Sequence, residues 1–302
     1  MRLCLNDSGL GGPYKTLAEE KFKTIHDIGF RVAGIGLDQR ASPDDIARVK
    51  DLFAKYDMMP GPAGTGNSPF HPDPAVRKQF QNNLKGMLNA ASKIGVPTIR
   101  VSGGNMNADD RWWFHPENHT QKALDMMIEA TRELIPYAED AGVVICPETT
   151  QFTIINTVRR MKEFVDRCDS PNVRIIFDVV NHTTSESLME TGVLFRKAVA
   201  ILGDRIGVLH VKDVTAEPGL VAHIVEAPMG TGYLDHASVI EASNELEPWK
   251  TFSLEHFSFE GVPKEQQWIG AYRHIMKVSN DIGYAWTGQH CTREKWLAGE
   301  CK

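Results

Sequence analysis

Short apolar runs alternate along the chain with longer stretches in which apolar residues recur every three to four positions. Several of the short runs are apolar throughout, which is typical of parallel strands that are buried on both faces. In the longer stretches, residues such as Leu84, Leu88 and Ala91 form one stripe along a helix. The pattern predicts strands at Met1–Asn6, Arg31–Leu37, Met58–Gly64, Thr98–Gly104, Val143–Thr149, Val173–Val179, Ile206–Asp213 and Thr251–Phe257.

A helical stretch follows each of these strands, and its ends carry suitable residues. Ser42 and Asp73 each precede a proline, which is a common way to begin a helix, and glycines such as Gly95 follow the last apolar position. The helices expected are Thr16–Ile28, Pro43–Tyr56, Pro74–Ile94, Glu117–Asp140, Thr153–Cys168, Glu190–Leu202, Asp235–Leu246 and Lys264–Ile282.

Strict alternation of strand and helix requires a parallel sheet, and eight such units predict an α/β fold of the closed (β/α)8 TIM barrel type. An open, doubly wound sheet would carry a GxGxxG turn before its first helix. The sequence has no such turn, so we expect no nucleotide cofactor. We expect one barrel domain at residues 1–282 and a C-terminal extension at residues 283–302, which packs across the barrel or against a neighbouring subunit.

Composition narrows the classes of partner. The chain has 33 Lys and Arg against 39 Asp and Glu, a net charge of −6, and no basic block, so we expect no nucleic-acid partner. No apolar run approaches the roughly 18 residues of a membrane span, and the opening MRLCLNDSGLGGP does not resemble a signal peptide. Five scattered cysteines without a CxxC pair predict reduced thiols of a cytoplasmic protein: Cys4, Cys146, Cys168, Cys291 and Cys301.

Four consecutive strands end on a side chain that can bind a metal. A carboxylate within an apolar strand is costly unless it is paired or bound to a metal, and the carboxyl ends of barrel strands meet at one rim. Three carboxylates and one imidazole favour Mn²⁺, with Mg²⁺ or Co²⁺ as alternatives, over a structural zinc. The predicted ligands are Glu148, Asp178, His210 and Glu255.

These strand ends, with the phrases "PET", "IIFDVVNH", "HVKD", "GTGYLD" and "LEH", resemble the xylose-isomerase-like barrels over about residues 1–282. That family includes sugar and sugar-phosphate isomerases, keto-sugar 3-epimerases and inosose dehydratases. The resemblance implies that the same four residues bind the metal and that Glu148 and Glu255 also act as the catalytic acid/base pair. It further implies a carbohydrate substrate and a homo-oligomer, either a dimer or a tetramer.

Removing a proton beside a carbonyl builds negative charge on oxygen, which a divalent cation stabilises, while carboxylates take and return the proton. We therefore expect a metal-dependent isomerase or epimerase of a neutral keto-sugar or related polyol ketone. Elimination of water begins with the same step, so a lyase acting on an inosose or a C-glycoside is one alternative. A metal- and sugar-binding module without chemistry is another. Strands seven and eight have no basic cluster near them, so we expect an unphosphorylated substrate. The Arg that commonly follows the equivalent of His210 in the epimerases is absent from this sequence.

Candidate substrate-binding residues lie on the loops above these strands. Asn181 and His182 follow the sixth strand, and Lys212 shares a strand face with His210, from which it can contact substrate or Glu148. Trp112 and Trp113 lie on the loop after strand four, where they would form an aromatic wall against a sugar ring.

Three further expectations concern neighbouring residues. Arg100, in the middle of strand four, needs a carboxylate partner inside the barrel, for which Glu148 is the candidate. His256 should face away from Glu255 by strand alternation. Trp286 and Trp296, near the C-terminus, would suit a subunit interface.

Overall fold

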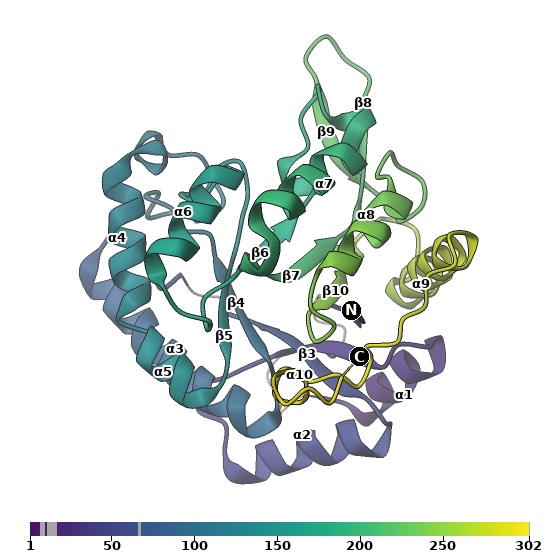
Figure 1. The fold of residues 1–302 in the computed structure, drawn as a ribbon, viewed down its shortest axis with the longest axis horizontal. Helices are drawn as coiled ribbons and strands as arrows, with labels where there is room; N and C mark the ends of the chain where they lie inside the picture. The colour runs from purple at the N-terminus through teal and green to yellow at the C-terminus, as the bar shows by residue number, and fades with distance from the viewer. Residues whose placement is uncertain (7–9, 11–16, 66–67, 302) are drawn as a thin grey trace.

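The computed structural model describes residues 1–6, 10, 17–65 and 68–301, and it confirms the predicted barrel (Figure 1). In this part of the chain, eight parallel strands close into one barrel with helices around it. The barrel strands are β1 (Arg2–Leu5), β2 (Val32–Gly36), β3 (Met59–Gly64), β4 (Thr98–Ser102), β5 (Val144–Glu148), β6 (Ile175–Asp178), β7 (Ile206–Val211) and β10 (Thr251–Leu254).

The order of the strands around the barrel follows the chain, so each strand pairs with its sequence neighbours and β10 closes the ring against β1. The register brings the candidate ligands to one level. Asp178 on β6 lies opposite His210 on β7, and Glu148 is the last residue of β5. Glu255 directly follows β10, whose Ser253 is opposite His210. All four side chains therefore lie at the carboxyl end of the barrel, where TIM-barrel active sites are found.

The helices cover the outside of the barrel, with their apolar faces packed on the strands. Ser42 and Asp73 cap two of them as predicted. Their bounds are α1 (Glu19–Ile28), α2 (Pro43–Lys55), α3 (Pro74–Ile94), α4 (Gln121–Arg132), α5 (Ile135–Ala141), α6 (Val158–Cys168), α7 (Thr191–Leu202), α8 (His236–Ala242), α9 (Lys264–Asp281) and α10 (Arg293–Leu297).

Two predicted helices were wrong in their bounds. The helix expected at Glu117–Asp140 is broken into α4 and α5, because Pro136 has no N–H to donate and fits only the first turn of a new helix. The helix expected from Thr153 begins only at Val158, where the Thr157 side chain accepts from the Arg160 N–H and caps the first turn.

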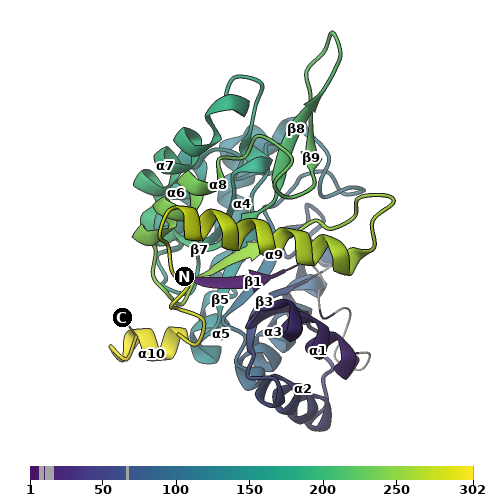
Figure 2. The same ribbon diagram turned by 90° about the vertical axis from the view of Figure 1, so that its right-hand side faces the viewer.

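A hairpin that the sequence analysis missed projects beyond the barrel mouth (Figures 1 and 2). It consists of the antiparallel strands β8 (Asp213–Glu217) and β9 (His223–Ala227), which follow β7. Its sequence signal was present, because Pro218 and Gly219 separate two strand-like runs. The hairpin carries Glu226, which contributes to the site described below.

The C-terminal segment packs against the amino end of the barrel, and Figure 2 shows α10 on the opposite side of the molecule from the hairpin. The Trp296 indole donates to Glu247, and Trp286 stacks edge-on against Phe252. Both indoles are half-buried on their own barrel, and the subunit interface expected from the sequence stays a prediction.

The prediction of five reduced cysteines was wrong for two of them. Cys291 and Cys301 form a disulfide across the turn that contains α10, while Cys4, Cys146 and Cys168 are free and buried. The tail folds back on itself and brings together two residues that the sequence alone does not mark as a pair. The cysteines therefore no longer support a cytoplasmic location, because disulfides are rare in that compartment.

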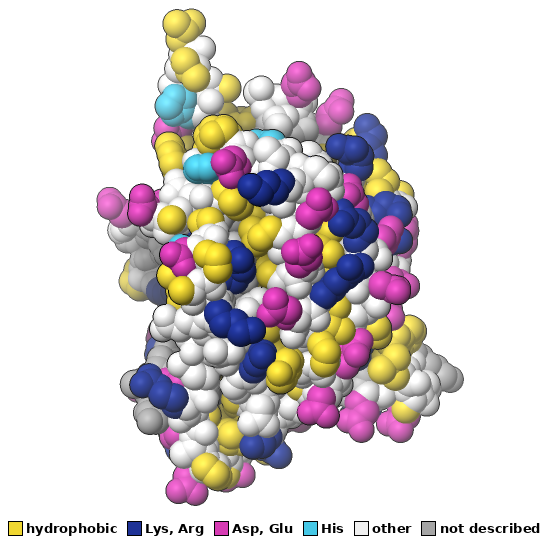
Figure 3. Space-filling view, turned by 90° about the vertical axis from the view of Figure 1, so that its left-hand side faces the viewer, with side chains coloured by type: hydrophobic (Ala, Val, Ile, Leu, Met, Phe, Trp, Pro, Cys, Tyr) yellow, Lys and Arg dark blue, Asp and Glu magenta, His cyan; other side chains and the backbone are white. Residues whose placement is uncertain are grey.

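Acidic and basic side chains are interspersed on the face shown in Figure 3. Among the helices that the structure describes, each one is too short or too polar to cross a bilayer.

Candidate metal centre

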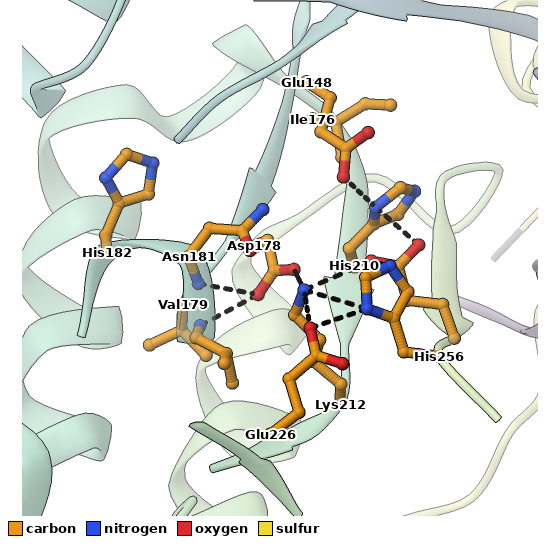
Figure 4. A network of polar contacts seen from close by, with 12 residues as sticks. Glu148, Ile176, Asp178, Val179, Asn181, His182, His210, Lys212, Glu226 and His256 are labelled. Atoms are coloured by element: carbon orange, nitrogen blue, oxygen red, sulfur yellow. Dashed lines mark hydrogen bonds and ion pairs between the residues drawn. The ribbon is translucent and has the colours of Figure 1, made fainter. Parts of the chain in front are cut away.

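The four predicted ligands converge on one point at the barrel mouth, and Figure 4 labels three of them, Glu148, Asp178 and His210. One ligand atom from each of Glu148, Asp178, His210 and Glu255 lies within 4.8 Å of the other three. All four side chains are buried. Such a group of three carboxylates and one imidazole is a donor set suited to a divalent cation.

Asp178 is oriented by the backbone of the short 3-10 turn that follows β6 (Val180–His182). Its Oδ1 accepts from the N–H groups of Val180, at 2.8 Å, and Asn181, at 3.3 Å. Its Oδ2 is buried and makes no hydrogen bond. Burial raises the pKa of Asp178, and the nearby Lys212 opposes that rise only in part. The turn therefore fixes one oxygen of the carboxylate and leaves the other directed into the cluster.

His210 lies between the two glutamates. Its Nδ1 is 3.2 Å from Glu148 Oε1 and 2.9 Å from Glu255 Oε2. Burial alone lowers the pKa of His210, but Glu255 and Glu148 outweigh burial and raise it to about 9. On the other side of the ring, the Asn6 amide nitrogen lies 2.9 Å from Nε2 and donates to Glu255 Oε2 at 3.1 Å. Asn6 thereby holds the ring and one carboxylate in a fixed relation.

Glu148 pairs with Arg100, as the sequence predicted, at 2.8 Å from Nη1 to Oε2. Burial would raise the pKa of Glu148, but His210 and Arg100 together hold it well below its usual range. The pKa of Glu255 is also lowered, because His210 outweighs the effect of burial there. Both glutamates are therefore ionised at neutral pH.

Lys212 takes a different partner from the one expected. It does not pair with Glu148; its Nζ lies 3.2 Å from Asp178 Oδ2 and 2.8 Å from Glu226 Oε1 on the hairpin. It is also 3.9 Å from Glu255 Oε1. Burial lowers the pKa of Lys212, but Asp178, Glu255 and Glu226 outweigh burial and raise it above its usual value. The ammonium therefore stays charged and links the hairpin to the ligand cluster.

The expectation that His256 faces away from Glu255 was wrong. Its Nδ1 lies 2.6 Å from Glu226 Oε1 and its Nε2 lies 3.5 Å from Glu255 Oε1. Strand alternation does not apply here, because β10 ends at Leu254 and the backbone turns at His256 with φ of 60°.

The charges and the carboxylate oxygens of the site fit a divalent cation. Asp178 Oδ2 and Glu255 Oε1 are buried without a hydrogen bond, and the Lys212 ammonium lies 3.2 Å from the first and 3.9 Å from the second. The carboxylates of Glu148, Asp178, Glu255 and Glu226 carry four negative charges. The permanent cations Arg100 and Lys212 stand against two of them, and the proton that the raised pKa of His210 retains stands against a third until a metal takes its place. A buried net charge is costly, and a dication at the cluster would remove it.

Two predicted substrate-binding residues, Asn181 and His182, lie on the turn after β6; Asn181 is next to Asp178, whereas Figure 4 shows the His182 ring set apart from the ligand cluster. Asn181 donates from its side chain to the Thr149 carbonyl at 3.3 Å. His182 stacks on the Phe177 ring, and its Nε2 lies 2.8 Å from Thr149 Oγ1. Burial lowers the pKa of His182 to about 4, so this ring is neutral at physiological pH. Both side chains are half-buried at the barrel mouth.

The two predicted substrate-binding tryptophans, Trp112 and Trp113, lie on the loop between β4 and α4, and both are exposed. The buried Asn105 amide fixes this loop by donating to the carbonyls of Arg111, at 3.0 Å, and Trp113, at 2.6 Å. The Trp113 ring lies 6.1 Å from that of Phe152 on the loop after β5. The loop is therefore held in place, with its aromatic rings facing solvent.

Sequence reasoning missed two residues that the structure places in contact with the cluster. Asn6 ends the first predicted strand, and its position next to the strand that carries Glu255 was the available signal. Glu226 lies on the unpredicted hairpin, so no strand-end argument pointed to it.

Comparison with known proteins agrees with this arrangement. The sequence pattern of the xylose isomerase-like TIM barrel family matches residues 22–278. No protein with a curated description matches the chain in sequence.

Solved structures of the same fold are similar over most of their length, at low sequence identity. A D-psicose 3-epimerase crystallised with D-fructose superposes with a TM-score of 0.72 at 15% identity, covering 93% of this chain and 99% of that one. A 3-keto-D-glucoside 4-epimerase from E. coli superposes with a TM-score of 0.68 at 17% identity, covering 93% of this chain and 99% of that one. A barrel protein from Mycobacterium smegmatis in complex with magnesium superposes with a TM-score of 0.69 at 14% identity, covering 93% of this chain and 97% of that one. With the family pattern matched over most of its length, this chain belongs to the xylose isomerase-like TIM barrel family.

Proposed function

We propose that this protein is a divalent-metal-dependent isomerase or epimerase of a neutral keto-sugar or related polyol ketone. The observation that carries the proposal is the placement of Glu148 and Glu255. They come from strands separated by β6 and β7, and both direct an oxygen at Nδ1 of His210. Two ionised carboxylates from different parts of the barrel thus meet at one imidazole nitrogen.

In the proposed reaction, Glu148 and Glu255 are the acid/base pair. Both carboxylates are ionised, so each has a lone pair with which to accept a proton from a carbon beside a carbonyl, and each can return one when protonated. Glu148, Asp178, His210 and Glu255 would hold the cation, which supplies electrophilic stabilisation of the oxygen next to that carbon. Proton return on the opposite face of the carbon gives an epimer, and return to the neighbouring carbon gives an isomer.

The surrounding residues have proposed roles in binding. We assign Asn181, His182 and Lys212 to the binding of substrate oxygens, for which the neutral His182 ring can donate or accept a hydrogen bond. We propose Trp112 and Trp113 as an aromatic wall of the mouth, Mn²⁺ as the metal, and a dimer or tetramer as the assembly. The cytoplasmic location stays a prediction.

The test is incubation of the Mn²⁺-loaded protein with ketoses, inososes and keto-glycosides in D₂O, followed by NMR and mass spectrometry. We expect deuterium beside a carbonyl with no loss of mass. Glu148→Gln and Glu255→Gln should each abolish the exchange, whereas Glu129→Gln, on the exposed face of α4, should leave it unchanged.

Other outcomes would replace the proposal. Deuterium uptake with loss of water or of an aglycone would identify a lyase on the same site. Metal binding without exchange into any substrate would favour the binding module. Near-normal exchange in both Gln variants would remove the acid/base assignment.

A further inference from the structure

A pocket of about 190 Å³ lies directly beside the metal centre, between the hairpin, the loop after β10 and helix α9. Lys212, Glu255 and His256 line its inner end. The rest of its wall is mostly apolar and includes Met229, Phe257, Phe259, Val262 and Ala271. We call this space the α9 chamber. It is polar where it meets the site and apolar beyond it.

The size and chemistry of the chamber select a class of group. An apolar cavity of about 150 Å³ can bind benzene, so a ring-sized group fits. Where Phe257, Phe259 and Val262 form the wall, the hydroxyl groups of a sugar would lose their water without gaining a hydrogen bond, which is costly. The polar part of the lining is Lys212, Asp213, Glu255, His256, Gln266 and Gln267. An apolar ring gains from the same burial, since it leaves water without losing a hydrogen bond.

The loop that closes the chamber is held in shape by one side chain of α9. The Gln267 amide donates to the carbonyls of Phe259, at 2.9 Å, and Val262, at 2.7 Å, while its oxygen accepts from the Phe259 N–H at 3.3 Å. The apolar wall is therefore built before a ligand arrives, and little ordering cost is added on binding.

We propose that the α9 chamber binds an apolar, ring-sized substituent of the substrate. The substrate class is then a keto-sugar that carries an apolar aglycone, rather than a free ketose. This inference rests on the proposed function for the sugar end of the ligand, while the chamber itself is defined by its own wall.

Gly270 offers a clean way to fill the chamber. It lines the space on α9, and a Cβ built there meets no other atom within 4 Å. Gly270→Ala should therefore be accommodated without a clash, and Gly270→Leu should extend further into the chamber. Both replace glycine inside a helix, so the Tm should be retained or raised. Glu265→Leu places the same side chain on the exposed part of α9, outside the chamber, as the matched control.

The experiment is calorimetric titration of the Mn²⁺-loaded protein with phenyl β-D-glucopyranoside and methyl β-D-glucopyranoside. The wild type and Glu265→Leu should bind the phenyl glycoside at least about ten-fold more tightly than the methyl glycoside, which is about 1.4 kcal/mol. The ratio should fall below about two-fold in Gly270→Leu and lie between these values in Gly270→Ala.

Three results would overturn the inference: no binding of the phenyl glycoside to the wild type, equal affinity for both glycosides, or a preference that persists in Gly270→Leu. The last would place the ring elsewhere, for example at the exposed rings of Trp113 and Phe152. Neither glycoside has a carbonyl and no turnover is measured. Failure here is therefore separate from failure of the deuterium-exchange test.

Discussion

Replacing Asp178 by Asn removes one negative charge from the ligand cluster while preserving the shape of the side chain. An amide oxygen can still accept from the N–H groups of Val180 and Asn181, which hold the wild-type Oδ1. The group that replaces Oδ2 is then a donor or a neutral acceptor, and neither matches a carboxylate as a ligand for a hard divalent cation. Lys212 keeps Glu226 as a partner at 2.8 Å.

The magnitude follows from linkage between binding and folding. A ligand that binds only the folded state at 100 times its Kd stabilises that state by about 2.7 kcal/mol. With about 2.1 cal/mol/K of unfolding entropy per residue, the 302 residues of this chain convert that energy into a Tm rise of about 4 °C. The same excess of cation should shift the Tm of Asp178→Asn by less than about 1 °C.

The measurement is differential scanning calorimetry of EDTA-treated protein, with and without Mn²⁺. The metal response is the difference between the two scans of each variant, so a change in the metal-free Tm caused by loss of the Asp178–Lys212 ion pair does not enter it. Asp140→Asn, on the exposed surface of α5, controls for the change of charge and should retain the full metal response. An equal Mn²⁺ response in Asp178→Asn and wild type would refute the assignment of Asp178 as a ligand.

Three further predictions follow from named contacts. Asn6→Ala removes the amide that holds His210 and Glu255, so calorimetric titration should show Mn²⁺ affinity about 10- to 100-fold weaker; unchanged affinity would exclude this positioning role. Burial lowers the pKa of His236 to about 4, below its unfolded value, so its stabilising contribution is lost as pH falls from about 6.5 towards 4. In urea unfolding, the free energy of unfolding should fall from pH 7 to pH 5 by roughly 1–2 kcal/mol less in His236→Gln than in the wild type. Parallel pH profiles of the two proteins would contradict this role of His236. Cys301→Ser should lower the free energy of unfolding by up to about 3 kcal/mol, and its Tm should no longer respond to a reductant. If a reductant still lowered the Tm of the variant, the response would not come from this disulfide.

The barrel and its four candidate ligands could be predicted because they depend on short-range patterns. Glu148, Asp178 and His210 can each be predicted independently, because each lies at or near the end of an apolar run. Closed parallel topology then brings equivalent strand ends to one rim without any knowledge of side-chain contacts. Arg100 could be paired with Glu148 for a similar reason, since neighbouring strands of a barrel share a register.

The features that the sequence did not predict depend on contacts between distant segments or on local breaks of a pattern. Alternation assigned His256 to the wrong face because it assumes a continuing strand, and the chain turns at that residue. Glu226 reaches Lys212 only because a hairpin folds back over the barrel mouth. The α9 chamber joins three separate segments, so no local pattern contains it.

The pairing of charges in the cluster explains how it can be both buried and functional. Each carboxylate ligand has a positive or proton-bearing neighbour: Arg100 for Glu148, Lys212 for Asp178, and His210 for Glu255. These neighbours differ in what happens when their carboxylate is lost. The Arg100 side chain is 34% exposed, so water can solvate it in Glu148→Gln. Lys212 is only 4% exposed, and it depends on Glu226 to remain charged if Asp178 is replaced. The hairpin therefore stabilises the ligand cluster electrostatically as well as forming a wall of the α9 chamber.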